Sequence, residues 1–246
     1  MEHKIALITG GASGLGENIS RYLASKNCDL ILTYHENRKK AESLKKELEE
    51  NYGVNILLKK CNLEREEDIN EVVSIVKENY QSIDYLVNNA AICLDTLFED
   101  KKKDNFMKTL EVNVVGTFLM SKLIGQIMYD NKKGSIVNLS STNGIDKYYP
   151  MSIDYDASKA AINSITHNLS LAFSPYVRVN AVAPGWVKTE KEMKDLEEDY
   201  IKSEEDKIFL KRFGECEEIS KVIYFLLSED ASYINNQVIR VDGGTY

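Results

Sequence analysis

The feature that most constrains the fold is a regular alternation of two kinds of segment. Short apolar runs rich in β-branched residues are typical of buried strands. They occur at residues 5–8, 30–33, 54–58, 85–87, 135–139, 177–182 and 238–241. Stretches with helical periodicity lie between them, at residues 15–26, 38–52, 66–80, 105–131, 155–173 and 217–227. This alternation predicts an α/β fold with a parallel sheet covered by helices on both faces.

The chain is expected to form a single domain over residues 1–246. Only three prolines occur, and no Gly/Ser/Pro-rich linker divides the chain. Residues 188–211 interrupt the alternation with a highly charged, helical pattern just after the sixth predicted strand. Ligands of open α/β sheets bind beyond the carboxyl ends of the strands. We therefore expect residues 188–211 to form a substrate lid; a solvated helix without a function is the alternative.

Charge excludes some classes of partner. The net charge of −8 argues against binding nucleic acid through a broad basic surface, because phosphate neutralisation needs an excess of Lys and Arg. Lys101, Lys102 and Lys103 form a short run among acidic residues, and we expect them to lie on solvated faces.

The cysteines and histidines form no metal-binding pattern. No C-x-x-C pair or H-E-x-x-H spacing occurs among Cys28, Cys61, Cys93, Cys216, His3, His35 and His167. We therefore expect no metal centre and unpaired thiols. No signal peptide is recognisable, and no stretch approaches the roughly 18 apolar residues of a membrane helix. These features predict a cytoplasmic protein that does not bind membranes.

A glycine-rich turn follows the first predicted strand. Gly10, Gly14 and Gly16 open the next helix within the sequence Thr-Gly-Gly-Ala-Ser-Gly-Leu-Gly. Missing side chains let a backbone approach a pyrophosphate closely, and a helix N-terminus offers free N–H groups and partial positive charge. Glycines also simply form turns. The position between a strand and an amphipathic helix favours dinucleotide binding.

Tyr155 and Lys159 lie one turn apart on one face of a predicted helix. A free phenol has a pKa of about 10, and a nearby cation favours the phenolate and brings that pKa closer to neutrality. Tyr155 could then exchange a proton with a carbonyl oxygen. Taken alone, such a pair is more typical of an amphipathic surface. Ser141 ends the strand at residues 135–139 in a polar cluster, where it could hydrogen-bond the same oxygen or cap a turn.

These three features, in this order and spacing, resemble the short-chain dehydrogenase/reductase family. Further matches are Asn88-Asn89-Ala90, Asn113, Pro184-Gly185 and the terminal Val-Asp-Gly-Gly at residues 241–244. The resemblance spans residues 4–246. It implies a Rossmann-fold three-layer sandwich with a parallel sheet of about seven strands.

The resemblance also implies a catalytic tetrad of Asn113, Ser141, Tyr155 and Lys159. Ser141 would polarise a carbonyl, Tyr155 would pass the proton, and Lys159 would lower the pKa of Tyr155 and hold the nicotinamide ribose. Asn113 would anchor a water that feeds Lys159, or equally cap a helix kink.

The resemblance places the dinucleotide and the substrate on two sets of residues. The expected NAD(P)(H) contacts are Gly10, Ser13, Gly14, Leu15, Gly16, Tyr34, His35, Asn62, Leu63, Asn89, Ala90, Tyr155, Lys159, Pro184, Gly185, Val187 and Thr189. The expected substrate contacts are Ser141, Tyr149, Tyr155 and Trp186, with Tyr148, Met151 and Met193 nearby. Aromatic residues in loops can equally serve packing alone.

The chain departs from the family pattern at three positions. Ala91 stands where the family usually has Gly, which would be strained if the backbone there needs φ > 0. Asn62 stands where Asp often contacts the adenine, and its amide oxygen can still accept that hydrogen bond. At the end of the second strand Tyr34 replaces an acidic residue. His35, Arg38 and Lys39 follow and favour NADP(H), whereas the lack of a basic residue at Ser13 leaves NAD(H) open.

The expected activity is the interconversion of a secondary alcohol and a ketone. The sequence at residues 213–219 and 236–244 is most similar to bacterial 3-oxoacyl-[acyl-carrier-protein] reductases. Lys132 and Lys133 could contact an acidic carrier protein or simply end a helix. Dehydrogenases of sugars, polyols or steroids are an alternative, and so is a dinucleotide-sensing module without catalysis. The resemblance implies a homotetramer formed by the helices around Asn113 and Tyr155.

Overall fold

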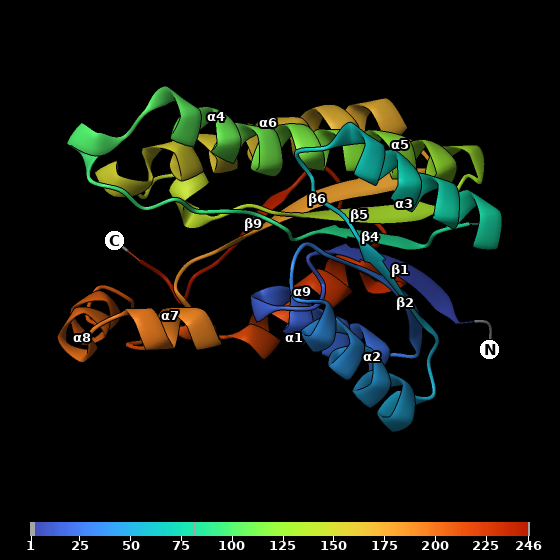
Figure 1. The fold of residues 1–246 in the computed structure, drawn as a ribbon, viewed down its shortest axis with the longest axis horizontal. Helices are drawn as coiled ribbons and strands as arrows, with labels where there is room; N and C mark the ends of the chain where they lie inside the picture. The colour runs from blue at the N-terminus through green and yellow to red at the C-terminus, as the bar shows by residue number, and fades with distance from the viewer. Residues whose placement is uncertain (1–2, 81, 246) are drawn as a thin grey trace.

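One parallel sheet forms the centre of the molecule (Figure 1). A computed structural model describes residues 3–80 and 82–245. The alternation of apolar runs predicted seven strands, and all seven lie in this sheet. They are β1 (Lys4–Thr9), β2 (Cys28–Tyr34), β3 (Ile56–Lys60), β4 (Tyr85–Asn88), β5 (Gly134–Leu139), β6 (Val177–Pro184) and β9 (Val238–Val241).

The strand order creates a crevice at one edge of the sheet. The order is β3-β2-β1-β4-β5-β6-β9, so the chain winds outward in one direction from β1 to β3 and in the other direction from β4 onward. Ala6 of β1 pairs with Leu30 of β2 on one side and with Tyr85 of β4 on the other. In such sheets the ligand binds where the winding reverses, beyond the carboxyl ends of the strands. That place is here the end of β1 and β4.

Helices cover both faces of the sheet, as predicted. The lower layer in Figure 1 contains α1 (Gly14–Ala24), α2 (Arg38–Tyr52) and α9 (Cys216–Leu227). The upper layer contains α3 (Glu66–Asn79), α4 (Lys103–Leu110), α5 (Thr117–Asp130) and α6 (Ile153–Phe173). Alternate strand residues feed two separate cores: Ala6 and Ile8 belong to one cluster, and Leu7 between them belongs to the other. The three-layer sandwich is therefore confirmed.

The predicted helix at residues 105–131 is not a regular α-helix throughout. A π-helical segment, η2 (Glu111–Gly116), separates α4 from α5 and contains Asn113. A π-helical turn carries one extra residue and occurs frequently at functional sites. Sequence periodicity did not reveal it because a single π-helical turn adds only one residue to an otherwise helical pattern.

An excursion follows β6 where the sequence predicted an interruption. Two short strands, β7 (Val187–Lys188) and β8 (Gly214–Glu215), pair at its base. Between them lie α7 (Glu190–Asp195) and α8 (Glu198–Glu205), which project beyond the carboxyl ends of the sheet (Figure 1). Periodicity could not predict β7 and β8 because each has only two residues.

Short 3₁₀ turns complete the described chain: η1 (Phe98–Asp100), η3 (Thr142–Gly144), η4 (Pro150–Ser152) and η5 (Glu229–Ala231). Three of them lie in the loops after β4 and β5, close to the crevice. Among the residues that the structure describes, no helix combines the length and apolar character needed to cross a membrane.

Candidate active site

The glycine-rich turn after β1 has a backbone conformation that residues with side chains could not adopt without strain or a steric clash. Gly10 and Gly14 adopt positive φ angles of 63° and 52°. A Cβ on Gly16 would lie only 2.2 Å from the carbonyl oxygen of Gly10, so α1 can approach the turn only because residue 16 lacks a side chain.

The turn after β4 supports the glycine-rich turn. Thr9 Oγ1 accepts hydrogen bonds from the backbone N–H groups of Asn89 and Ala90, at 3.0 and 3.1 Å. The side chain of Asn89 donates in return to the carbonyl of Thr9, at 3.0 Å. The structure thus brings together the predicted residues from β1 and β4. Ala91 is not among the described residues with positive φ, so the strain considered for it is absent.

This turn fits the pyrophosphate of a dinucleotide. Ser13 begins α1 without a side-chain cap, so the N–H groups of the first turn are available to an anion. A Cβ added to Gly14 would meet no atom within 4 Å, which shows open space beside the turn. Leu15 follows on the same helix start and packs partly against the core.

The end of β2 is polar and exposed. Tyr34 packs partly against the core, whereas His35 is exposed and lies 3.8 Å from Glu36. Arg38 is also exposed and donates to Glu42 at 2.7 Å. The first turn of α2 contains no acidic residue.

The loop after β3 lies beside this region. The amide oxygen of Asn62 accepts from the backbone N–H of Glu64 at 3.1 Å, and one lone pair of that oxygen stays available. Leu63 is buried against Gly116 of η2, where an added Cβ would approach within 2.7 Å. The adenine contacts predicted for Asn62 and Leu63 stay predictions.

Tyr155 and Lys159 lie on the first turns of α6, with Lys159 Nζ 5.3 Å from the centre of the Tyr155 ring. Lys159 also donates to the carbonyl of Leu139, the last residue of β5, at 2.7 Å. Burial lowers the pKa of Lys159 to about 8. The pair therefore sits at the carboxyl end of the sheet, not on an amphipathic surface.

Burial dominates the pKa of Tyr155 in this structure, and the lowering effect predicted for Lys159 stays a prediction. Burial raises the pKa of Tyr155 above its ordinary range, and a hydrogen bond with Ser141 offsets only part of that rise. Lys159 Nζ faces the ring, and Leu139 takes one of its hydrogen bonds. Desolvation favours the neutral form of each group, so here it outweighs their mutual attraction.

Ser141 belongs to a network that fixes the loop after β5. Its hydroxyl and Asn143 hydrogen-bond each other, with both contacts at 3.2 Å. Asn143 donates in turn to Asp156 at 2.6 Å, and Asp156 also accepts from the backbone N–H of Tyr149 at 2.9 Å and from Ser152. Sequence analysis missed Asn143 and Asp156, although Asp156 directly follows Tyr155.

Asn113 holds the loop after β4 from the π-helical segment. Its side chain accepts from the N–H of Ile92 and donates to the carbonyl of Ile92, both at 2.8 Å. It also donates to Ser158 at 3.1 Å on α6. Asn113 thus joins the loop to the helix that carries Tyr155, and the water predicted for it stays a prediction.

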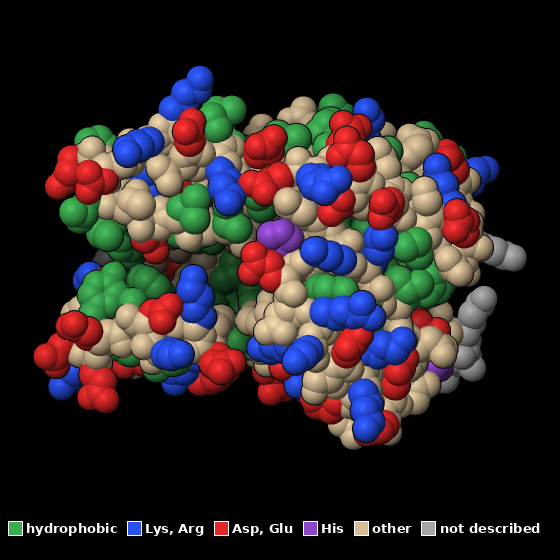
Figure 2. Space-filling view, viewed as in Figure 1, with side chains coloured by type: hydrophobic (Ala, Val, Ile, Leu, Met, Phe, Trp, Pro, Cys, Tyr) green, Lys and Arg blue, Asp and Glu red, His purple; other side chains and the backbone are tan. Residues whose placement is uncertain are grey.

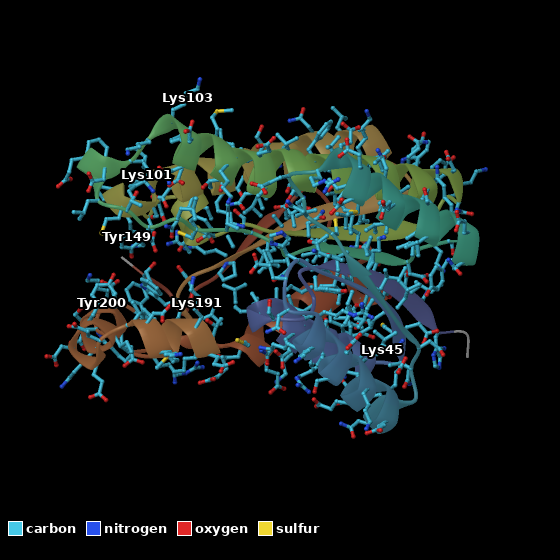
Figure 3. All side chains as sticks on the ribbon, in the orientation of Figure 1. Lys45, Lys101, Lys103, Tyr149, Lys191 and Tyr200 are labelled. Carbon is cyan, nitrogen blue, oxygen red and sulfur yellow. The ribbon has the colours of Figure 1, made fainter. Side chains whose placement is uncertain are left out.

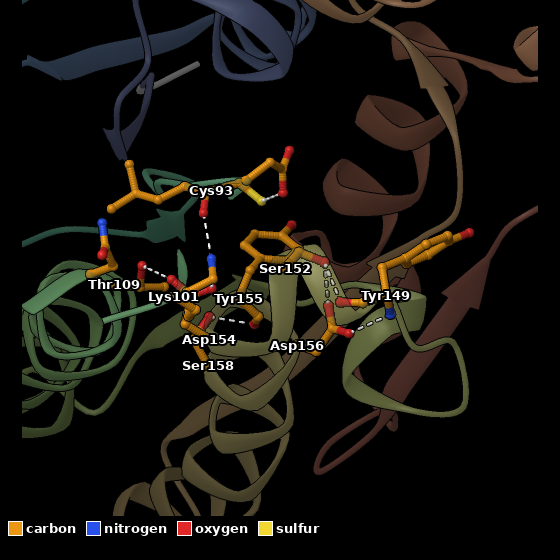
Figure 4. Close-up of polar contacts among 12 residues, drawn as sticks. Cys93, Lys101, Thr109, Tyr149, Ser152, Asp154, Tyr155, Asp156 and Ser158 are labelled. Atoms are coloured by element: carbon orange, nitrogen blue, oxygen red, sulfur yellow. Dashed lines mark hydrogen bonds and ion pairs between the residues drawn. The ribbon is translucent and has the colours of Figure 1, made fainter. Parts of the chain in front are cut away.

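Lys101 does not lie on a solvated face, which corrects the prediction for the run of three lysines. Its side chain is only 6% exposed and lies 2.8 Å from Asp154, which is fully buried (Figure 4). Burial raises the pKa of Asp154, but hydrogen bonds from Lys101 and Thr109 more than offset it and leave that pKa below its ordinary value. Lys102 and Lys103 are exposed, as predicted.

An aromatic cluster connects the excursion to the body. Tyr149 and Trp186 make an edge contact at 6.3 Å between ring centres, Trp186 stacks on Phe213 at 5.4 Å, and Tyr200 of α8 meets Trp186 edge-on. Tyr149 and Tyr200 lie on opposite sides of the gap between the upper layer and the excursion (Figure 3). Figure 2 shows a hollow at this gap with apolar side chains around it. Sequence analysis missed Tyr200 because nothing in its spacing links it to Tyr149.

The remaining predicted cofactor residues follow β6. Pro184 ends that strand, and Gly185 packs so closely on Asp242 that an added Cβ would lie 2.7 Å from the Asp242 side chain. Val187 is buried, and Thr189 caps the first turn of α7 through Glu192. All four predicted residues therefore lie at the base of the excursion, at the crevice edge.

Comparison with known proteins identifies the family. The family described as Enoyl-(Acyl carrier protein) reductase matches residues 10–246. The chain belongs to the short-chain dehydrogenase/reductase family. Among its curated relatives are 3-oxoacyl-[acyl-carrier-protein] reductases of Aquifex aeolicus, 35% identical over 100% of this chain and 98% of the relative, and of Thermotoga maritima, 36% identical over 99% and 98%.

A solved member of the family has a closely similar structure. ElxO with NADP bound aligns with a TM-score of 0.91 and 30% identity, covering 99% of this chain and 98% of that one. As a short-chain dehydrogenase/reductase with an intact glycine-rich turn, this protein is an NAD(P)(H)-dependent oxidoreductase.

Proposed function

We propose that this short-chain dehydrogenase/reductase reduces the ketone of a 3-oxoacyl thioester to a secondary alcohol, with NADPH as its preferred cofactor. The observation that carries the proposal is the position of Tyr155 at the carboxyl end of the sheet. Its hydroxyl is hydrogen-bonded to Ser141, and the ammonium of Lys159 lies over its ring. A glycine-rich turn that fits a pyrophosphate lies at the same edge.

Each catalytic residue has a role that follows from its chemistry. A bound nicotinamide supplies the hydride that the carbonyl carbon needs. Tyr155 donates its proton to the carbonyl oxygen, and Ser141 donates a hydrogen bond to the same oxygen as negative charge develops there. Lys159 stabilises the phenolate that Tyr155 becomes, and Asn113 keeps the facing loop in place.

The preference for NADPH rests on the end of β2. An acidic residue there would accept from a ribose 2′-hydroxyl and repel a 2′-phosphate, and Tyr34 has no carboxylate to do either. His35 and Arg38 are exposed at this place and can approach a phosphate. One family member is known with NADP bound, which agrees with this preference.

The substrate class rests on relatives and on the pocket wall. Curated relatives matched over the whole chain reduce 3-oxoacyl groups on a carrier protein, as their names state. Tyr149 and Trp186 supply an apolar wall for an acyl chain. A sugar or polyol would need more polar partners there.

Lys132 and Lys133 do not suit the docking of a carrier. They precede β5 and so lie at the amino edge of the sheet, opposite the crevice, and Lys133 is 2.6 Å from Asp84. A carrier would have to approach the hollow beside α7 and α8. We propose that this excursion, at residues 188–211 as predicted, acts as the substrate lid of a single-domain protein.

We further propose a cytoplasmic homotetramer. All four cysteines are unpaired, as expected in a reducing compartment. Val115 of η2, Phe118 of α5 and Leu171 of α6 are large apolar side chains exposed on the upper layer, where copies could pack.

The decisive experiment compares the wild type with Tyr155→Phe. NADPH and NADH fluorescence titrations would measure binding, and turnover would be measured on 3-oxoacyl thioesters, simple ketones and sugars. We expect tighter binding of NADPH than of NADH, NADPH binding that persists in the variant, and a loss of turnover of at least about a hundredfold. Turnover of sugars alone would favour the alternative dehydrogenase, and binding without turnover would favour a dinucleotide sensor.

A further inference from the structure

The buried Lys101–Asp154 pair joins the loop after β4 to the residue that precedes Tyr155. Lys101 Nζ donates to the carbonyl of Leu94 at 2.6 Å as well as contacting Asp154 (Figure 4). Asp154 accepts a second hydrogen bond from Thr109 of α4, at 2.6 Å. The pair therefore connects three segments: the loop, α4 and the first turn of α6.

The enclosure of this pair sets it apart from the surface lysines beside it. The side chains of Lys101 and Asp154 are 6% and 0% exposed. A charge buried without its partner is costly, so removal of either residue leaves the other in an unfavourable state. Most other ion pairs in the described chain include at least one well-exposed side chain and contribute little.

The loop that Lys101 holds forms a wall of the active site. Cys93 adjoins Leu94 and lies close enough to both Tyr155 and Lys159 to interact with them electrostatically. Asn113 binds the backbone of Ile92, Lys101 binds the carbonyl of Leu94, and Thr96 N–H donates to the carbonyl of Met151 at 3.3 Å. Every second residue of the segment 92–96 is thus held by a backbone hydrogen bond to another part of the chain.

We propose that Lys101 and Asp154 are positioning residues that hold residues 92–96 against Tyr155 and so set the substrate side of the active site. Of the three contacts that hold this loop, at Ile92, Leu94 and Thr96, only the one at Leu94 is made by a charged side chain. The proposal rests on the proposed function for its catalytic consequence, but the placement of the loop can be measured without turnover.

Cys93 provides the measurement. It is the exposed cysteine of the chain, whereas Cys28, Cys61 and Cys216 are buried. Burial and the carboxylate of Asp95 raise the pKa of the Cys93 thiol to about 12, so alkylation in the wild type should be slow. A loosened loop would separate the thiol from the Asp95 carboxylate, to which it donates at 3.2 Å, and so lower that pKa and accelerate the reaction with iodoacetamide.

The experiment compares Lys101→Met with Lys103→Met in the full-length protein, using mass spectrometry to follow alkylation of each cysteine. We expect Cys93 to react about tenfold faster in Lys101→Met and at the wild-type rate in Lys103→Met, which removes the same charge from an exposed site. Cys28 and Cys61 should stay protected. Equal acceleration at all cysteines would indicate global unfolding and would overturn the proposal, as would an unchanged rate at Cys93.

Three further variants separate positioning from stability. The double variant Lys101→Met/Asp154→Asn leaves no unpaired buried charge, so it serves if Lys101→Met does not fold, and faster alkylation of Cys93 is expected there too. NADPH affinity should be unchanged in every variant, while kcat/KM for the ketone falls about tenfold. Asp154→Asn should recover more activity than Asp154→Ala, because its amide oxygen can still accept from Thr109. Equal activity of these two variants, at the wild-type level, would contradict the proposal.

The two proposals can fail separately. If the wild type binds NADPH but reduces no ketone, the proposed function fails, and the alkylation rates still decide whether Lys101 holds the loop. If the wild type reduces 3-oxoacyl thioesters while Lys101→Met matches it in both kcat/KM and alkylation, the positioning role fails alone.

Discussion

Burial shifts the two central side chains toward their neutral forms. It raises the pKa of Tyr155 and lowers the pKa of Lys159 to about 8. A phenol that keeps its proton at neutral pH is the form needed to protonate a carbonyl oxygen. In this structure Tyr155 is therefore arranged as a proton donor, and the stabilisation of its phenolate by Lys159 matters only after the proton has left.

The shifted pKa of Lys159 predicts a pH dependence of stability. The folded-state pKa lies below the ordinary 10.5, so the folded state binds fewer protons than the unfolded state between about pH 8 and 10.5, and this contribution to stability rises with pH across that window. Lys159→Met removes it. Between pH 7 and pH 10.5 the free energy of unfolding of the wild type should therefore increase by roughly 3 kcal/mol relative to that of Lys159→Met.

Urea unfolding at both pH values would measure this difference. Lys77→Met, which removes an exposed lysine on α3, is the matched control and should show a constant difference from the wild type. A constant difference for Lys159→Met as well would contradict the lowered pKa.

Two local elements, the glycine-rich turn and the π-helical segment, assemble the site. The turn brings α1 against β1 and β4, and η2 aims Asn113 at Ile92 instead of along the face of a regular helix. Each element uses a local departure from regular geometry to satisfy contacts with a segment distant in sequence.

The glycine-rich turn predicts a contrast between two substitutions. Gly16→Ala would place its Cβ against the Gly10 backbone, which cannot move aside as a flexible side chain could, and should lower the free energy of unfolding by about 3 kcal/mol. Gly14→Ala meets no atom and should cost only about 1 kcal/mol through its positive φ. Thermal unfolding and NADPH titration would check both, and equal losses would show that close approach at Gly16 is unimportant.

At the scale of the whole molecule, the upper helical layer leaves large apolar side chains uncovered. Phe118 is 40% exposed and Leu171 is 81% exposed, on α5 and α6. These helices also carry or adjoin Asn113 and Tyr155, so packing between copies would support the site from outside. Assembly and activity would then both depend on α5 and α6.

Assembly can be tested by placing a charge on this layer. The variant Phe118→Glu/Leu171→Glu should convert a four-chain species into smaller ones, because burying two carboxylates at an interface is unfavourable. Tyr52→Glu changes an exposed aromatic residue on α2 and should leave the mass unchanged. Light scattering would measure both, and a single-chain mass for the wild type would refute the homotetramer.

The sequence by itself determined the layers of this protein and the order of its chemical groups. Apolar runs and helical periods are local signals, so seven strands and most helices could be placed from them. The glycine-rich turn and the spacing from Tyr155 to Lys159 are equally local. The number of residues between two side chains fixes whether they lie on the same face of a helix or strand, and this does not depend on the rest of the chain.

The tertiary structure alone decided what surrounds each group. Lys101 stands in a run of charges and yet its side chain is buried. Its partners are the carboxylate of Asp154, 53 residues away in sequence, and the carbonyl of Leu94. The pKa of Tyr155 likewise depends on burial by distant segments, which here outweighs the nearby lysine. Desolvation and pairing depend on distance in space, and no local pattern of residues encodes that distance.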